Sequence, residues 1–104
     1  MDTEMINDKV SQGIMLISAE KYDAAKKVFE EIISEAPRTL EAYIHLGNAC
    51  ANLEQYSEAI EAFKKALLVD PNYAEAYFFI GSIYVLMNEK VKAVEFYNLS
   101  LIHI

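Results

Sequence analysis

The chain has 104 residues, enough for one domain, and 54% of them are hydrophobic, so a buried core is expected and general disorder is excluded. Its 9 Lys and Arg residues stand against 16 Asp and Glu residues, which gives a formal net charge of −7. This balance argues against nucleic acid and against an anionic membrane surface as partners, because both are bound through Lys and Arg.

The chain has one cysteine, Cys50, which rules out an internal disulfide and fits a reducing compartment, so a cytoplasmic protein is expected. The longest apolar run covers residues 76–87, which is shorter than the ~17 residues that a membrane-spanning helix needs. We therefore expect a buried helix there and no membrane span. Because the chain has three Gly and two Pro residues, helices should dominate.

The apolar spacing predicts six helices along the chain. They are expected near residues 5–18, 22–35, 39–53, 56–69, 73–87 and 90–103. In the fourth, apolar residues recur every three or four positions from Ala59 to Leu67. Pro71 ends that helix, since the residue before a proline is pushed out of the α region. Asn72 and Glu75 resemble a capping box that opens the fifth helix.

The sequence repeats every 34 residues. This offset separates all three glycines and both prolines, namely Gly13, Gly47 and Gly81, then Pro37 and Pro71. It also connects a series of alanines and a series of aromatic residues, which are Ala25, Ala59 and Ala93, then Phe29, Phe63 and Tyr97. Each period contains two of the predicted helices, so three units of paired helices are expected.

These residues at this period resemble the tetratricopeptide repeat, a 34-residue pattern of aromatic and small residues that ends in Pro. The second unit carries the pattern at Tyr43, Leu46, Gly47, Ala59, Phe63, Ala66 and Pro71. The third carries it at Tyr77, Ile80, Gly81, Tyr84, Ala93 and Tyr97. The first unit keeps Gly13, Ala25, Phe29 and Pro37.

The resemblance implies an all-α fold, a right-handed solenoid of three antiparallel helix pairs. It implies a single domain over residues 1–104, with repeats at about 6–39, 40–73 and 74–104. Packing gives the same reading, because small residues fit where helices approach closely and aromatic rings fill the wider crossings. Three units are the minimum that buries a continuous core.

The two ends of the array differ in polarity. The first unit has Asp8, Lys9 and Gln12 where later units are apolar, so its outer face should meet water and begin the array. The last helix is apolar where earlier second helices are not, at Phe96, Leu99, Leu101, Ile102 and Ile104. We expect no capping helix after it. Further repeats of a longer protein or a second copy of the chain would cover these residues, unless they fold back onto the third hairpin.

No catalytic or metal-binding motif is found in the sequence. His45 and His103 lack Cys or carboxylate neighbours at ligand spacing, and His45 is expected at the surface or between repeats. Cys50 takes a position that belongs to the core in the other units. The glycines never cluster into a phosphate-binding loop. We therefore expect no enzyme, no metal and no cofactor.

The remaining candidate site is a groove. In the family that the chain resembles, the first helices of successive units line a concave groove that holds a peptide or a partner helix. The matching residues here are Asn7, Val10, Ile14, Ile17, Glu41, Ile44, Asn48, Ala51, Glu75, Phe78, Ser82 and Val85. Asn48 and Ser82 would hydrogen-bond the ligand. The expected partner is a protein segment with an apolar face and some basic residues.

Some members of this family hold the acidic C-terminus of a chaperone with Lys, Asn and Arg side chains. The matching positions here carry no Lys or Arg and are Val10, Ile14, His45, Glu75 and Phe79, so this role is not expected. Two functions remain. One is an adaptor that binds a protein segment in its groove, and the other is a scaffold that forms a homo-oligomer through the apolar last hairpin. A regulatory part of a longer protein is a third.

Overall fold

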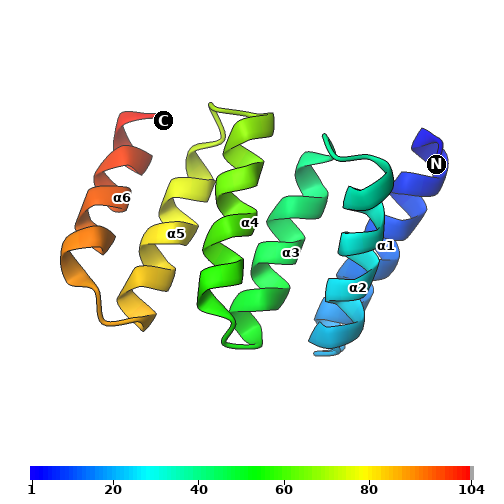
Figure 1. Ribbon diagram of the computed structural model, residues 1–104, viewed down its shortest axis with the longest axis horizontal. Helices are drawn as coiled ribbons and strands as arrows, with labels where there is room; N and C mark the ends of the chain where they lie inside the picture. The colour runs from blue at the N-terminus through cyan, green and yellow to red at the C-terminus, as the bar shows by residue number, and fades with distance from the viewer. Residues whose placement is uncertain (104) are drawn as a thin grey trace.

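The structure is a computed structural model and describes residues 1–103. Its helices are α1 (Thr3–Ser18), α2 (Tyr22–Glu35), α3 (Leu40–Asn52), α4 (Tyr56–Val69), α5 (Ala74–Leu86) and α6 (Lys90–Ile102). They form three antiparallel pairs that stand side by side along the longest axis, with the termini at opposite ends (Figure 1). The predicted all-α solenoid is confirmed, and every predicted helix boundary lies within two residues of the observed one.

A glycine on the first helix of each pair lets an aromatic ring of the second helix approach. A Cβ atom added at Gly47 would lie 2.6 Å from the nearest ring carbon of Phe63, and one added at Gly81 would lie 2.8 Å from the ring of Tyr97. Gly13 faces the aromatic ring of the first pair in the same way. The 34-residue spacing of the glycines is therefore a packing rule, because a side chain at these positions would occupy the space of the ring.

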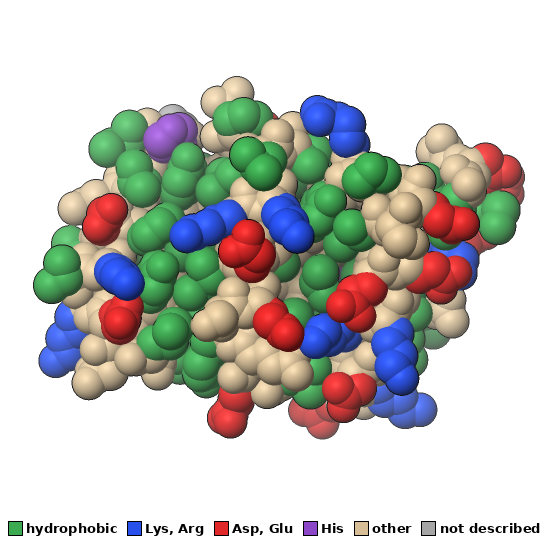
Figure 2. All heavy atoms as spheres, viewed as in Figure 1, with side chains coloured by type: hydrophobic (Ala, Val, Ile, Leu, Met, Phe, Trp, Pro, Cys, Tyr) green, Lys and Arg blue, Asp and Glu red, His purple; other side chains and the backbone are tan. Residues whose placement is uncertain are grey.

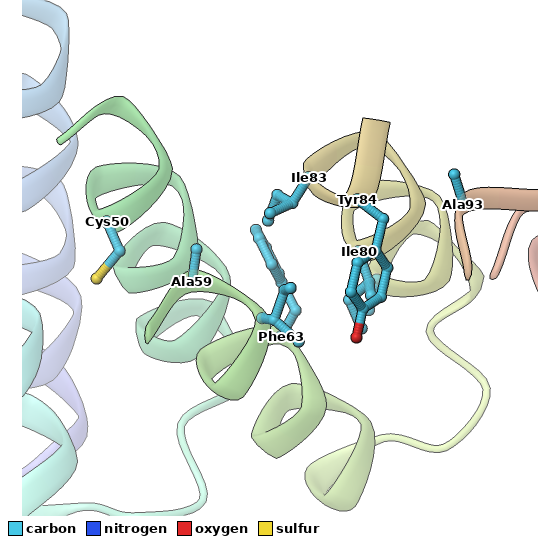
Figure 3. Close-up of a cluster of buried hydrophobic side chains, with 9 residues drawn as sticks. Cys50, Ala59, Phe63, Ile80, Ile83, Tyr84 and Ala93 are labelled. Carbon is cyan, nitrogen blue, oxygen red and sulfur yellow. The ribbon is translucent and has the colours of Figure 1, made fainter. Parts of the chain in front are cut away.

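Successive pairs are joined by rings that pack across their boundary. The imidazole of His45 on α3 stacks on Phe29 of α2, with ring centroids 5.3 Å apart. Phe79 on α5 packs on Phe63 of α4 at 5.2 Å. The side chains of Phe63 and Ile83 gather with other buried residues in the space between α4 and α5 (Figure 3). His45 is thus an inter-repeat residue, one of the two positions predicted for it.

The turn inside each pair contains a residue in the left-handed region. Glu20, Glu54 and Asn88 have φ angles of 60°, 61° and 60°. In the second pair, the amide N–H of Gln55 donates to the carbonyl oxygen of Cys50 at 2.9 Å, which closes the C-terminus of α3. Residues other than glycine are strained in this conformation, so these turns cost some stability.

The start of α5 differs from the prediction. Tyr73 is the residue before the helix, and no side chain caps this end by a hydrogen bond. Asn72 instead donates its backbone N–H to Oδ1 of Asp70 at 3.0 Å, and the N–H of Tyr73 donates to the carbonyl oxygen of Asp70 at 3.1 Å. The predicted capping box of Asn72 and Glu75 is wrong because the turn after α4 holds Asn72 outside the helix.

Candidate functional site

The residues predicted for the groove all lie on the first helices of the pairs, α1, α3 and α5. Those that are exposed are Asn7, Ile14, Glu41, Glu75, Phe78 and Val85. Those that are partly buried are Val10, Ile17, Ile44, Asn48, Ala51 and Ser82. The large apolar side chains that solvent reaches most therefore belong to α1 and α5, at the two ends of the row.

Phe78 is the exposed aromatic residue of α5. Its ring packs against Tyr97 of α6 at 5.5 Å between centroids and meets Phe79 edge-on at 6.1 Å. Phe78 is nevertheless 51% exposed, and Val85 on the same helix is 52% exposed. The fold thus fixes the orientation of the Phe78 ring while about half of its surface stays open to solvent.

The hydroxyl group of Ser82 is engaged within the chain. It lies 3.0 Å from the carbonyl oxygen of Phe78, to which it donates, and 3.2 Å from the hydroxyl oxygen of Tyr97. A bound peptide would therefore meet the Ser82 oxygen as an acceptor.

Two residues of the predicted C-terminal interface pack largely inside their own hairpin. Phe96 and Leu99 are partly buried. The ring of Phe96 packs against Tyr84 at 5.5 Å and against Tyr77 at 6.5 Å between centroids. Part of the Phe96 surface is therefore already covered by α5.

The end of α6 is open. Leu101 and Ile102 are 68% and 73% exposed, so Leu101 does not fold back onto the hairpin, and Ile104 lies outside the described residues. Val94 is 58% exposed, whereas Ile60, its equivalent 34 residues earlier, is 7% exposed and belongs to the core shared with α5. Hydrophobic side chains accordingly gather over α5 and α6 in Figure 2, while charged ones are spread over the rest of that face.

The outer face of α1 is largely polar, as predicted. Asp8 and Gln12 are exposed, and Nζ of Lys9 forms an ion pair with Oε1 of Glu31 at 2.7 Å. Met15 is the exception: it is 72% exposed and lines a shallow cavity of about 420 Å³.

A cavity of about 370 Å³ opens between α2 and α4. Its apolar lining consists of Tyr43, Leu46, Cys50, Ile33 and Ala62. Its polar lining consists of Lys26, Glu30, Ser34, Glu58, Glu61 and Lys65. None of the groove residues lines it, since the residues that α3 contributes lie on a different face of that helix. The motif search along the sequence missed this cavity.

The titratable groups near the cavity are shifted by burial and by one ion pair. Burial lowers the pKa of His45 and raises the pKa of the Cys50 thiol, which is 1% exposed. The hydrogen bond from Nζ of Lys26 to Oε2 of Glu58, at 2.8 Å, raises the pKa of Lys26. Cys50 therefore lacks the lowered pKa of a reactive cysteine and packs as a core residue.

Over residues 1–103, no three His, Cys, Asp or Glu side chains are grouped so that they could hold a metal ion. Within the same residues, no helix has the length and apolar character needed to cross a membrane.

Comparison with known proteins gives a family and a set of similar folds. A model of the tetratricopeptide repeat matches residues 40–73, and a second model of this repeat matches residues 74–101, so that more than half of the chain is matched. No curated protein matches the sequence.

Among solved structures, a chain of the CopN–Scc3 complex superposes with a TM-score of 0.94 at 18% identity, over 99% of this chain and 61% of that one. The type III secretion translocator chaperone SycD of Yersinia enterocolitica gives 0.94 at 18% identity, over 98% and 77%. MamA of MSR-1 gives 0.87 at 26% identity, over 94% and 56%. The chain thus spans less than two thirds of the CopN–Scc3 and MamA chains.

Proposed function

The chain belongs to the tetratricopeptide repeat family, and from this we propose that it is a non-enzymatic adaptor that binds a peptide or helix of a partner protein in a concave groove formed by α1, α3 and α5. The family and the fold support the broader role of a protein–protein interaction module. The groove and its ligand are the specific part of the proposal.

The exposed apolar side chains on the first helices carry this proposal. Ile14 is 39% exposed, and Phe78 and Val85 are both more than half exposed. None of the three belongs to the repeat pattern that holds the helices together. Covering such surface is favourable by about 25 cal/mol per Å², so a ligand with an apolar face would gain affinity here. Glu41 and Glu75, also exposed on these helices, favour a ligand with basic residues beside its apolar face.

Two of the similar structures also support binding of a protein segment. One is a complex, CopN–Scc3, and the other, SycD, is a translocator chaperone. Both superpose over nearly the whole chain, so a protein with this arrangement of helices can serve such a role.

The test uses peptides selected from a random library displayed on phage and bound to the purified chain. We expect Phe78→Glu to weaken binding of the selected peptides by at least about tenfold, which is ~1.4 kcal/mol, in fluorescence anisotropy. Leu68→Glu is the matched control, because Leu68 is 79% exposed but lies on the second helix α4. If both variants bind equally well, the groove is not the binding site.

The exposed end of α6 favours a second function, self-association. The observation is the exposure of Leu101 and Ile102, at the end of the array where an equivalent earlier position is buried. Sedimentation velocity over a range of concentrations should show dimers of the wild-type chain. The double variant Leu101→Glu/Ile102→Lys should be monomeric, and Phe78→Glu should still associate. A wild-type chain that is monomeric throughout would exclude self-association while leaving the groove proposal in place.

A further inference from the structure

We propose that the cavity between α2 and α4 is a second binding site, separate from the groove, which receives an aromatic side chain of a partner protein flanked by basic residues. Its lining, its charge and its counterpart in the third helix pair each point to this occupant.

The counterpart in the third pair is filled by aromatic rings of the chain itself. Phe96 lies 34 residues after Ala62, and Tyr84 lies 34 residues after Cys50. In the third pair, the ring of Phe96 packs against Tyr84 at 5.5 Å and against Tyr77 at 6.5 Å. In the second pair, a methyl group and a thiol occupy the equivalent positions. The space that a ring fills in one pair is therefore left as a cavity in the other.

The floor of the cavity matches the surface on which Phe96 packs. Tyr43 is the equivalent of Tyr77, is 7% exposed, and donates its hydroxyl to the carbonyl oxygen of Pro37 at 2.7 Å. This hydrogen bond fixes the ring of Tyr43 in place. Leu46 also lines the floor and is partly buried. An aromatic ring that enters the cavity would therefore meet a rigid aromatic and aliphatic surface, which favours offset or edge-on packing.

The size of the cavity suits a single large side chain. Its volume of about 370 Å³ lies at the lower end of the ~300–1,000 Å³ typical of ligand pockets. The walls are close enough to bury one ring and too close for a helix to lie between α2 and α4. A peptide that inserts one aromatic residue would leave its backbone at the rim.

The charge around the rim favours basic residues beside that aromatic residue. Glu30, Glu58 and Glu61 stand there with Lys26 and Lys65. Nζ of Lys26 donates to Glu58 at 2.8 Å, so this pair is neutralised within the chain. The remaining rim groups have an excess of one carboxylate, and the whole chain carries a net charge of −7. These exposed charges would orient a basic peptide and speed its association.

The probe is an acetylated and amidated Arg-Phe-Arg peptide, titrated into the labelled full chain and followed by ¹⁵N–¹H NMR. We expect saturable shifts at the amides of Leu46, Cys50 and Ala62, with roughly millimolar affinity because one side chain supplies most of the contact. An Arg-Ala-Arg peptide should give no saturable shift there, and a Glu-Phe-Glu peptide should bind several-fold more weakly. Absence of shifts in the cavity, or equal shifts with Arg-Ala-Arg, would overturn the proposal.

The deciding variant is Ala62→Phe, which supplies the ring that Phe96 supplies in the third pair. It should lower the affinity of Arg-Phe-Arg by at least about tenfold. Phe78→Glu, a change in the groove, should leave the affinity unchanged, which separates this site from the one proposed above. If Ala62→Phe does not fold by circular dichroism, Glu30→Lys/Glu61→Lys replaces it, because both residues are exposed. That variant should weaken Arg-Phe-Arg several-fold, and unchanged binding would refute the site.

Discussion

The second and third helix pairs follow the same pattern of glycine and aromatic residues, yet they differ in what surrounds it. The second pair has Ala62 and Cys50 beside a cavity with a charged rim, whereas the third has Phe96 and Tyr84, whose rings pack together. The positions shared by both pairs hold the helices at a fixed distance. The positions that differ decide which surface each pair offers to a partner. Function in this molecule therefore depends on the residues outside the repeat pattern.

The difference between the pairs supplies matched experiments within one chain. Several equivalent positions, 34 residues apart, carry different residues in the same backbone environment. Changing one toward the other separates the effect of the side chain from the effect of its place in the fold.

The largest difference is expected when a methyl group is added at the glycines. Gly47→Ala would place a Cβ atom 2.6 Å from the ring of Phe63, which is 1% exposed and has no space into which to move. Gly81→Ala meets Tyr97, which is partly buried and can move toward solvent. We expect a loss of about 2 kcal/mol in the free energy of unfolding for Gly47→Ala and about 1 kcal/mol for Gly81→Ala. Urea denaturation measures both, and equal losses would contradict the role of ring burial.

An intermediate effect is expected at the left-handed turn residues. Glu54→Gly should raise the free energy of unfolding by about 1 kcal/mol, because glycine adopts a φ of 61° without strain. Asn88→Gly should raise it by about 0.5 kcal/mol, since Asn tolerates this conformation better than Glu. Thermal unfolding of both variants compares the two turns. A loss of stability in Glu54→Gly would show that the Glu54 side chain makes a contact that outweighs the strain.

The smallest effect is a pH dependence at the boundary between pairs. Burial lowers the pKa of His45 below its ordinary value of 6.5, although Glu41 partly opposes the shift. As pH falls below 6.5, the unfolded chain takes up a proton before the folded chain does, so stability should decrease. Above pH 6.5 this contribution is constant because His45 is neutral in both states.

Denaturant unfolding between about pH 5 and pH 7.5 measures this slope around the ordinary histidine pKa. His45→Phe, which copies the Phe79 found in the third pair, should remove the part of the slope near pH 6. Phe79→His should add a comparable slope, because its ring would pack on Phe63 as His45 packs on Phe29. An unchanged slope in His45→Phe would assign the pH dependence to other groups.

Local sequence features were sufficient to place the helices. The apolar spacing and the positions of glycine and proline located all six to within two residues. They failed at the start of α5, where Asn72 was predicted to cap the helix. Whether Asn72 enters the helix depends on how the Asp70 turn closes, and a residue pattern does not describe that geometry.

The candidate sites were less predictable from the residues. The placement of the twelve groove residues on first helices follows from their spacing, because spacing sets the face of a helix. Their exposure does not follow, since Ile44 is partly buried whereas Phe78 is half exposed. The cavity beside Cys50 could have been suspected from one signal, Ala62 at the position of Phe96. That signal has meaning only once both residues are known to face α3 and α5.

The order of the helices, their pairing and the close contact of each pair were contained in the amino-acid sequence, because periodic apolar residues and repeated glycines act over short distances along the chain. The depth of each surface was decided by the packing of three pairs. Whether a side chain such as Leu101 or Ala62 is covered depends on the atoms that neighbouring pairs bring to it, and those atoms come from distant parts of the chain. The groove, the cavity and the open end of α6 are therefore properties of the tertiary structure.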